Sequence, residues 1–275
     1  MKAAVLCEQP GDLVIEDLKI DTPGPQEVLI QTVGAGLCHS DLHFMEGLFR
    51  SKLPAVMGHE SAGVVQSVGR DVTYVKPGDH VVACLSIFCG QCRQCLSGNP
   101  HRCSNTRATS RGRDDEPRLQ RHDGTPVDQM ARLGGFAEEM LIHQNGIVKV
   151  TEDVSLEKAC LIGCGVTTGF GAAVKTAAVP VGATVCVIGC GGIGLSAIQG
   201  ARVAGASRII AVDMSAEKLE TAKVMGATDT LNASETDDVV TAVKELTKGG
   251  VEYSFEAIGL KQTAEQAFEM LAVGG

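Results

Sequence analysis

The first half of the chain carries short apolar runs in which hydrophobic and polar residues tend to alternate. Turn-forming stretches such as Pro23-Gly24-Pro25 and Pro77-Gly78-Asp79 separate these runs. Short runs bounded by such turns predict β-strands, here at residues 2–7, 13–18, 27–33, 62–68, 81–85 and 137–143. We therefore expect a β-rich domain with a barrel-like closure over residues 1–154.

A charged stretch at residues 104–133 interrupts this pattern. It contains six arginines and five acidic residues, and it shows no apolar period. A segment of this kind predicts a solvated surface loop, and a role as a lid or a subunit contact is the alternative.

Strands and helices alternate regularly in the second half. Ser155 is a candidate N-cap for the helix that opens this half. Two successive strand starts lie 24 residues apart (184 to 208), the length of one βαβ crossover. The pattern predicts strands at residues 184–188, 208–212, 229–232 and 251–257, and helices at residues 193–204, 216–225, 237–247 and 262–271.

Glycines 205, 226 and 249 follow three of these helices, where a left-handed cap is favoured. Residues 155–275 are therefore predicted to form an open, doubly wound parallel α/β sheet. A complete sheet of this kind has about six strands. Since only four are predicted here, we expect the domain to be incomplete at its C-terminal end.

Composition narrows the class of protein. The chain has 275 residues and a net charge of −9, from 24 basic and 33 acidic residues, which argues against a nucleic-acid partner. Its apolar runs end before the roughly 18 residues of a membrane span. The apolar run at the N-terminus is too short for a signal peptide, and an acidic residue follows it too early. A cytoplasmic protein without membrane contact is expected.

Eleven cysteines are the first indication of chemistry. Disulfide frameworks are typical of short secreted domains, and reducing compartments disfavour them. Metal ligation or catalysis is therefore the favoured use for some of these cysteines. Four follow the spacing C-x2-C-x2-C-x7-C, which chance would give in fewer than about one chain in a thousand. They are Cys89, Cys92, Cys95 and Cys103. This spacing favours a closed all-thiolate zinc site, and an iron–sulfur cluster is the alternative.

A second group of possible ligands is dispersed along the chain. Cys38 opens a Cys-His-Ser-Asp stretch, His59 lies in Gly-His-Glu, and Cys164 lies between two glycines. Two thiolates and one imidazole would leave a fourth coordination position for water or substrate. Singly, each residue could equally be a core cysteine or a buried histidine. We assign that role to the remaining cysteines, Cys7, Cys84, Cys160, Cys186 and Cys190.

Glycines with the spacing G-x-G-x-x-G follow the predicted strand 184–188. A chain this rich in glycine contains about 0.5 such matches by chance, so the context between a strand and a helix is what gives this one weight. Gly189 would form the tight turn, Gly191 would admit a pyrophosphate, and Gly194 would let the helix pack on the strand. Gly192 and Ile193 lie between them and complete a predicted dinucleotide-binding turn.

Asp213 ends the next predicted strand, 19 residues after Gly194. A carboxylate there accepts hydrogen bonds from ribose hydroxyls and repels a 2′-phosphate by about 4 kcal/mol per unit charge at contact. The position therefore favours NAD over NADP. Lys218 could reach the same ribose, or it could be a solvated helix charge.

Taken together, these motifs resemble the zinc-containing medium-chain alcohol dehydrogenases along nearly the whole chain. The charged stretch after Cys103 is closer to the longer class, which includes dehydrogenases of hydroxymethyl-thiol adducts of formaldehyde. The resemblance implies a GroES-like catalytic domain followed by a Rossmann domain, two zinc ions per subunit, NAD, and an alcohol or aldehyde substrate. It also implies a homo-oligomer for the full-length protein. An inactive zinc-stabilised fragment that binds at most part of a dinucleotide is the alternative.

The resemblance also implies roles for single residues. Cys38, His59 and Cys164 match the catalytic zinc ligands, and the four clustered cysteines match the structural zinc. The hydroxyl of Ser40 would hydrogen-bond the substrate, and His43 would pass its proton towards solvent. The remaining matches are Asp41 and Glu60 as carboxylates just outside the ligand shell, Thr168 beside the nicotinamide, and His39 at the position of a pyrophosphate-binding arginine. We hypothesise that a histidine there is the weaker anion clamp and speeds release of NADH.

Overall fold

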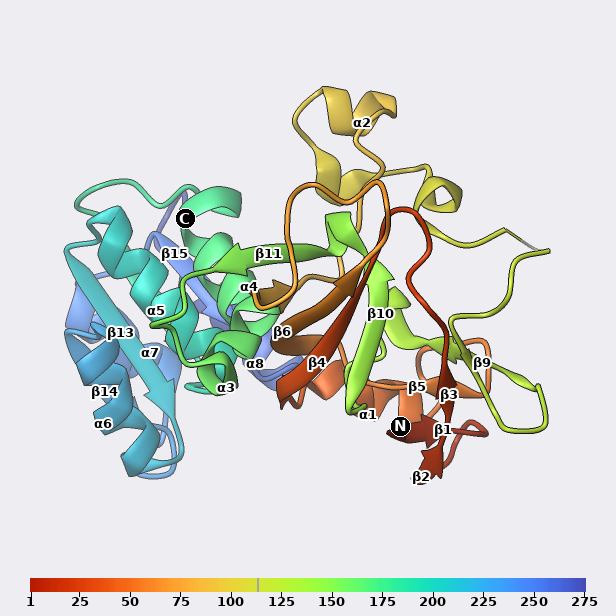
Figure 1. Cartoon of the computed structure of the whole chain (residues 1–275). Coiled ribbons are helices and arrows are strands. Elements are labelled where there is room, and N and C mark those ends of the chain that lie inside the picture. Colours follow the sequence, from red (N-terminus) through yellow and green to blue (C-terminus); the bar gives the residue numbers. More distant parts are fainter. Residues whose placement is uncertain (113) are drawn as a thin grey trace. The chain divides into compact units, whose positions relative to one another are not determined.

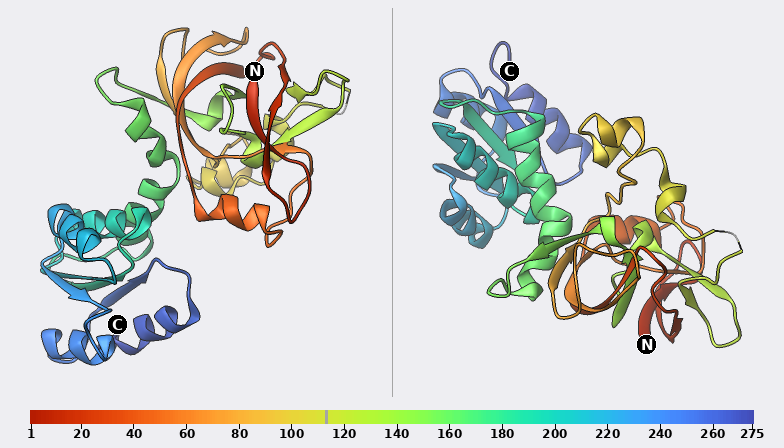
Figure 2. Two further views of the ribbon diagram at one scale, coloured as in Figure 1. Left: turned by 90° about the horizontal axis from the view of Figure 1, so that it is seen from below. Right: turned by 45° about the horizontal axis from the view of Figure 1, so that its top comes forward.

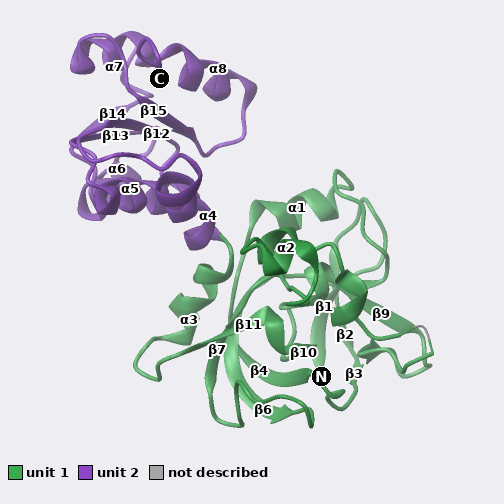
Figure 3. Cartoon of the chain, turned by 90° about the horizontal axis from the view of Figure 1, so that it is seen from above, with its two compact units in different colours: residues 1–164 green, residues 165–275 purple. Residues whose placement is uncertain are grey.

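The computed structural model describes residues 1–112 and 114–275 and consists of two compact units, residues 1–164 and residues 165–275 (Figures 1 and 3). The predicted division lay at residue 154. The first unit extends further because helix α3 (Leu156–Ala159) and the 3₁₀ turn Cys160–Gly163 join its core. Leu156, Ala159 and Cys160 pack there against Ala62 and Val82. Ser155 is the N-cap of α3, as predicted.

The first unit is built from two sheets. The five-stranded sheet has the order β10-β4-β6-β7-β11, formed by Glu139–His143, Glu27–Gly36, Glu60–Val68, His80–Ala83 and Ile147–Val150. The six-stranded sheet has the order β2-β1-β5-β9-β8-β3, formed by Leu13–Asp17, Lys2–Leu6, Ala55–Val56, Pro126–Gln129, Leu119–Gln120 and Lys19–Ile20. Buried aliphatic side chains fill each sheet's core, so the β-rich prediction for this half is confirmed.

The prediction of a solvated loop at residues 104–133 was wrong in part. This segment supplies strands β8 and β9, and its Leu119 and Val127 are buried in the core of the six-stranded sheet. Strands of two and four residues are too short to show an alternating pattern, which is why the sequence hid them. Residue 113, within the same segment, lies outside the described residues. The preceding segment around helix α2 (Arg93–Leu96) stands out from the strands of this unit as a lobe (Figures 1 and 2).

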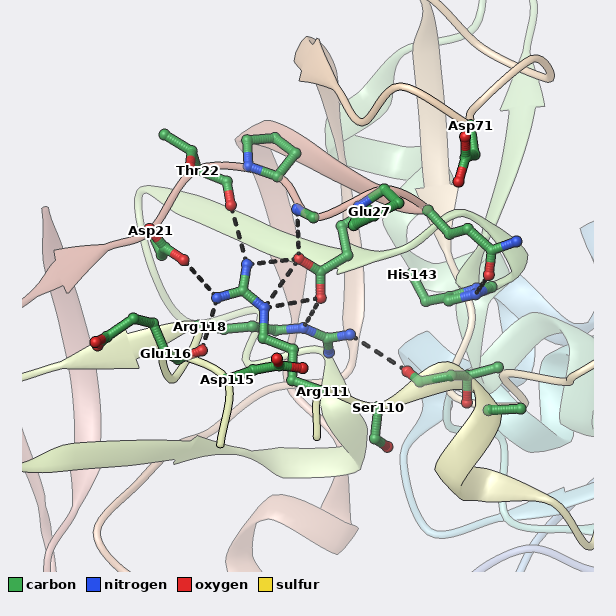
Figure 4. Close-up of a pocket in the computed structure, with 16 residues that line it drawn as sticks. Asp21, Thr22, Glu27, Asp71, Ser110, Arg111, Asp115, Glu116, Arg118 and His143 are labelled. Atoms are coloured by element: carbon green, nitrogen blue, oxygen red, sulfur yellow. Dashed lines mark hydrogen bonds and ion pairs between the residues drawn. The ribbon is translucent and has the colours of Figure 1, made fainter. Parts of the chain in front are cut away.

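A buried ion-pair network fastens the segment after that lobe to the barrel. The guanidinium groups of Arg111 and Arg118 converge on the carboxylate of Glu27 at the start of β4, each with an N–O distance of 2.6 Å (Figure 4). The side chain of Glu27 is only 7% exposed, and it also accepts a hydrogen bond from the backbone N–H of Gly24. Burial raises the pKa of Glu27, but these donors outweigh it and lower the pKa to about 2. The network lines a cavity of about 560 Å³.

Glu27→Gln is expected to destabilise the protein by about 3 kcal/mol at neutral pH, because it leaves the largely buried Arg118 without its carboxylate, while Arg111 keeps its ion pair with Asp21. The folded-state pKa lies below the ordinary value of 4.5. The stabilisation is therefore fully present above pH 4.5 and is lost as the pH falls towards 2. Urea unfolding at several pH values measures this difference. The exposed Glu8→Gln is the control, and a neutral-pH difference below about 1 kcal/mol would contradict the prediction.

The second unit is a parallel sheet with the order β14-β13-β12-β15, formed by Asp229–Asn232, Arg208–Asp213, Thr184–Ile188 and Tyr253–Glu256. Its helices are α4 (Gly165–Gly171), α5 (Gly192–Ala204), α6 (Ala216–Met225), α7 (Val239–Thr247) and α8 (Lys261–Glu269). Helices α5 and α6 cover one face, and α7 and α8 cover the other (Figure 3). The doubly wound prediction is confirmed, and each predicted strand and helix ends within two residues of its observed bounds.

Two consecutive helical segments flank Cys164 in the chain. They are Leu156–Gly163 and Gly165–Thr176, and as a pair they reach the length and apolar composition of a membrane span. None of the described helices alone is long and apolar enough to cross a membrane.

Candidate active site

Four ligand groups from three separate segments meet in the first unit. Cys38 is the N-cap of helix α1 (His39–Met45), His59 and Glu60 lie at the start of β6, and Cys164 follows the 3₁₀ turn that ends this unit. Their ligand atoms all lie within 4.8 Å of one another. The structure therefore brings together the three predicted catalytic-zinc ligands. It also places the carboxylate of Glu60 among them, although the prediction put Glu60 outside the ligand shell.

Asp41 connects the histidine to the cysteine in this cluster. Its Oδ2 accepts a hydrogen bond of 3.0 Å from the backbone N–H of Cys38, and its Oδ1 lies 3.3 Å from Nδ1 of His59. Both Asp41 and His59 are buried. With Nδ1 engaged by the carboxylate, Nε2 is the nitrogen left for a metal, an arrangement usual for metal-binding histidines.

The groups around His59 favour positive charge at its ring. Burial lowers the pKa of His59, but Asp41 and Cys164 outweigh it and raise the pKa to about 11. Burial raises the pKa of Glu60. Two sulfurs, one imidazole nitrogen and one carboxylate oxygen are donors that zinc accepts in tetrahedral sites, so these residues fit a zinc ion.

Gly36 is a residue of this site that the sequence did not indicate. A Cβ atom there would lie 2.8 Å from Oε2 of Glu60 and 2.6 Å from Cδ2 of Leu161. Any larger residue would therefore displace the Glu60 carboxylate from the cluster. Strand β4 has two glycines, Gly34 and Gly36, and neither stands in a pattern by which sequence analysis could identify its role.

Helix α1 also carries the residues predicted to move a proton. Ser40 lies in its first turn, and His43 lies one turn further along. The imidazole ring of His43 lies 4.8 Å from the ring of His39 and 5.2 Å from the ring of Phe49, measured between centroids. The catalytic roles of Ser40 and His43 stay predictions.

The four clustered cysteines form a second ligand group in the lobe around α2. Their sulfurs all lie within 4.8 Å of one another, with pairs at 3.5 and 3.9 Å. Four sulfurs placed tetrahedrally about 2.3 Å from one zinc ion would be about 3.8 Å apart. A multinuclear iron–sulfur cluster is larger than one ion and would hold its ligand sulfurs further apart. Backbone N–H groups lower the pKa of Cys92 and Cys103, which favours thiolate, whereas burial raises the pKa of Cys95 to about 11. The spacing of the four sulfurs is what fits a single zinc ion.

The remaining cysteines are only partly as predicted. Cys160, Cys186 and Cys190 are buried, as expected of small core residues, and Cys84 is half-buried. Cys7 is exposed, so its assignment to the core was wrong. Its thiol lies instead beside the surface pair Glu16–Arg121.

The glycine turn has the predicted form. Gly189 has a φ of +93°, and a Cβ atom on Gly194 would lie 1.7 Å from the carbonyl oxygen of Gly189. A Cβ atom on Gly191 or Gly192 would meet no protein atom within 4 Å, so the space before the N-terminus of α5 is open to a ligand. Ile193 follows in the first turn of α5.

Asp213 lies at the end of β13, beside this turn. Its Oδ2 accepts a hydrogen bond of 2.8 Å from the backbone N–H of Cys190, and its Oδ1 accepts one of 2.9 Å from Ser215. Asp213 and Lys218 line a cavity of about 650 Å³. The other lining residues come from the ends of the strands and from the segments that follow them, and they include Ile188, Val212, Ser215, Ala233, Thr236, Asp237, Val239, Ile258, Leu260 and Thr263. The cavity lies within the second unit and is large enough for a nucleoside.

Thr168 is not among the residues that line this cavity. It lies in helix α4, which packs closely on α5, since a Cβ atom on Gly169 would lie 2.0 Å from the carbonyl oxygen of Ile193. The packing brings the segment of Thr168 beside the first turn of α5. Its predicted contact with a nicotinamide stays a prediction, as does that of His39, an exposed residue of α1, with a pyrophosphate.

Two protein-family models match the chain. One describes an alcohol dehydrogenase GroES-like domain and matches residues 24–152, and the other describes a zinc-binding dehydrogenase and matches residues 192–275.

Solved structures of similar proteins cover nearly the whole chain. An alcohol dehydrogenase zinc-binding domain protein from Burkholderia ambifaria is 37% identical, with a TM-score of 0.89 over 98% of this chain and 74% of that one. Benzyl alcohol dehydrogenase from Acinetobacter calcoaceticus is 37% identical, with a TM-score of 0.86 over 100% of this chain and 75% of that one. A putative zinc-binding dehydrogenase from Sinorhizobium meliloti 1021 bound to NADP is 30% identical, with a TM-score of 0.81 over 100% of this chain and 74% of that one.

Proposed function

Because the chain belongs to the zinc-binding alcohol dehydrogenases of the medium-chain family, a family of oxidoreductases, we propose that it oxidises an alcohol to an aldehyde or ketone and reduces NAD. The observation that carries this proposal is the cluster of Cys38, His59 and Cys164 beside Glu60. With Glu60 beside the ligand shell and not within it, the three nitrogen and sulfur ligands leave one coordination position for the substrate.

The residues around this cluster have different roles in the proposed reaction. Zinc, when bound there, polarises the substrate oxygen and stabilises negative charge on it. Asp41 holds the His59 ring by its Nδ1 atom, and the buried environment of both residues limits access of water. Ser40 accepts the hydroxyl proton of the substrate, and His43 passes it towards solvent.

The second unit holds the dinucleotide. The open backbone of Gly191 and Gly192 at the N-terminus of α5 binds the pyrophosphate, and Asp213 and Lys218 contact the adenosine ribose in the adjoining cavity. NAD held there would supply the acceptor for the hydride that leaves the substrate carbon. We assign a second, structural zinc ion to the four cysteines of the lobe.

Formation of NADH by the zinc-loaded protein tests the proposal. The substrates are a series of primary alcohols of increasing length, with benzyl alcohol included because one similar structure is a benzyl alcohol dehydrogenase. Turnover should depend on NAD and stop when a chelator removes zinc. A folded, zinc-loaded protein that turns over none of these alcohols would favour the inactive fragment instead.

Asp213→Asn is expected to lower the preference for NAD over NADP, as a ratio of kcat/KM, by about 100-fold. The amide keeps one of the two oxygen acceptors that Asp213 offers to the backbone of Cys190 and Ser215. It loses the charge that repels a 2′-phosphate, a repulsion of about 4 kcal/mol at contact that solvent reduces. Asp237→Asn, in the same cavity, is the control for a change in total charge and should shift the ratio less. An unchanged ratio in Asp213→Asn would remove the reason for choosing NAD.

A further inference from the structure

The side-chain amide of Gln9 binds three backbone groups of one short segment. Its Nε2 donates to the carbonyl oxygens of Phe44 at 2.6 Å and Phe49 at 2.8 Å, and its Oε1 accepts from the N–H of Ser51 at 3.2 Å. These partners lie 35 to 42 residues from Gln9 in the sequence. One half-buried side chain from the start of the chain thus spans the C-terminal end of α1 and the loop that follows it.

Other contacts fix the same loop less directly. The carbonyl oxygen of His43 accepts hydrogen bonds from the N–H groups of Leu48 and Phe49, and that of Met45 accepts one from Gly11. Gly47 has a φ of +78°, which suits glycine at this turn. The path of residues 44–51 is therefore set from both sides, by α1 and by the segment that contains Gln9.

The consequence of this path is the position of the Phe49 ring. It meets the His43 ring edge to face, with 5.2 Å between centroids and 82° between planes, and it meets Phe44 at 5.5 Å. The His43 ring also lies 4.8 Å from the His39 ring, measured between centroids. Within residues 1–112 and 114–275 the His43 ring makes no hydrogen bond, so ring contacts determine where the imidazole lies.

We propose that Gln9 is a positioning residue for proton transfer: its amide holds the 44–51 loop so that Phe49 keeps the His43 imidazole in place. This proposal rests on the proposed function, since it assigns His43 the proton. Glutamine suits the position because its amide both donates twice and accepts. Glutamate would set a charge against two carbonyl oxygens, and methionine would make none of the three bonds.

Gln9→Met is the first test. We expect kcat for alcohol oxidation to fall about tenfold while KM changes less than about twofold, because a misplaced relay slows the reaction without weakening substrate binding. Added imidazole buffer should restore most of kcat by carrying the proton in place of His43. Gln66→Met makes the same change on β6, at an exposed glutamine whose side-chain amide donates to that of Gln31, and should leave kcat unchanged.

The Phe49 ring provides the second test, which leaves Gln9 and its hydrogen bonds intact. Phe49→Leu should lower kcat in the same way and respond to imidazole, whereas Phe49→Tyr, which keeps the ring, should retain kcat. If Gln9→Met does not fold, the comparison of Phe49→Leu with Phe49→Tyr tests the proposal by itself. Equal kcat in Phe49→Leu and wild type, or a loss that imidazole does not restore, would overturn the proposal.

NMR of the histidine rings separates this inference from the proposed function. The chain has seven histidines, and His43→Gln identifies the His43 signals by their disappearance. We expect those signals to shift and broaden in Gln9→Met and Phe49→Leu, and to stay unchanged in Gln66→Met. If the wild type oxidises no alcohol, the proposed function fails while this measurement still tests the positioning. Unshifted His43 signals in both variants would refute it.

Discussion

Replacing Cys38 with serine is expected to remove one zinc ion per chain and to lower kcat/KM for alcohol oxidation by at least about 1,000-fold. A serine hydroxyl is a poor zinc ligand at neutral pH because it stays protonated, whereas thiolate is a preferred one. Without the metal, negative charge on the substrate oxygen is less stabilised, which raises the activation free energy by several kcal/mol. An increase of about 4 kcal/mol corresponds to a 1,000-fold loss of kcat/KM.

The same substitution should leave the fold intact, which makes its result easy to interpret. Cys38 is the N-cap of α1, a position at which serine is among the preferred residues. The backbone N–H of residue 38 can still donate to Asp41. Zinc content, steady-state kinetics and urea unfolding measure the three effects separately. Cys7→Ser, at an exposed cysteine outside both ligand groups, is the control. Full zinc content with normal turnover in Cys38→Ser would remove Cys38 from the metal site.

The parallel sheet could be predicted closely from the sequence because its strands are local apolar runs. Strand β12 is buried at four of its five positions, and glycines at residues 205 and 226 mark the ends of two helices. In the first unit the pattern is weaker. Strand β5 has only two residues, and it exists because Ala55 pairs with Leu6 and with Asp128, far away in the sequence. Such pairing has no local signature.

The candidate site shows the same division. The residue types and spacings of Cys38, His59 and the cysteine lobe indicated metal ligands, since these side chains have specific chemistry. The convergence of Cys38 with Cys164 is a property of the fold, which the sequence could only suggest through a resemblance. Gln9 had no indication at all, because it acts on backbone groups at least 35 residues away and glutamine is common on surfaces.

The Glu27 network escaped prediction for a related reason. Its arginines lie 84 and 91 residues further along, within a stretch whose charges resembled a solvated loop. Charge composition alone cannot distinguish a solvated arginine from one whose carboxylate partner comes from another strand. Only the burial of Glu27 makes the distinction.

The lobe around α2 is expected to depend on its metal for local stability. Helix α2 and the 3₁₀ turn Pro100–Arg102 contain no buried residue, and Leu96 is 75% exposed, so apolar burial contributes little there. A structural zinc ion supplies on the order of 10 kcal/mol in small domains folded around it. Here that energy would act mainly on residues 89–103, which can unfold while both sheets stay intact.

Cys103→Ser should therefore remove one zinc ion per chain and open the lobe to proteolysis, with cleavage at least about tenfold faster than in the wild type, since the metal-free lobe spends far more time open. Arg93 and Arg102 offer trypsin two sites within it. The site at Cys38, His59 and Cys164 should keep its zinc, which distinguishes this result from the loss of metal in Cys38→Ser. Cys84→Ser, at a half-buried cysteine outside both ligand groups, is the matched control. Unchanged zinc content and an unchanged rate of cleavage in Cys103→Ser would contradict this prediction. They would mean that the lobe is not stabilised by a zinc ion bound to these four sulfurs.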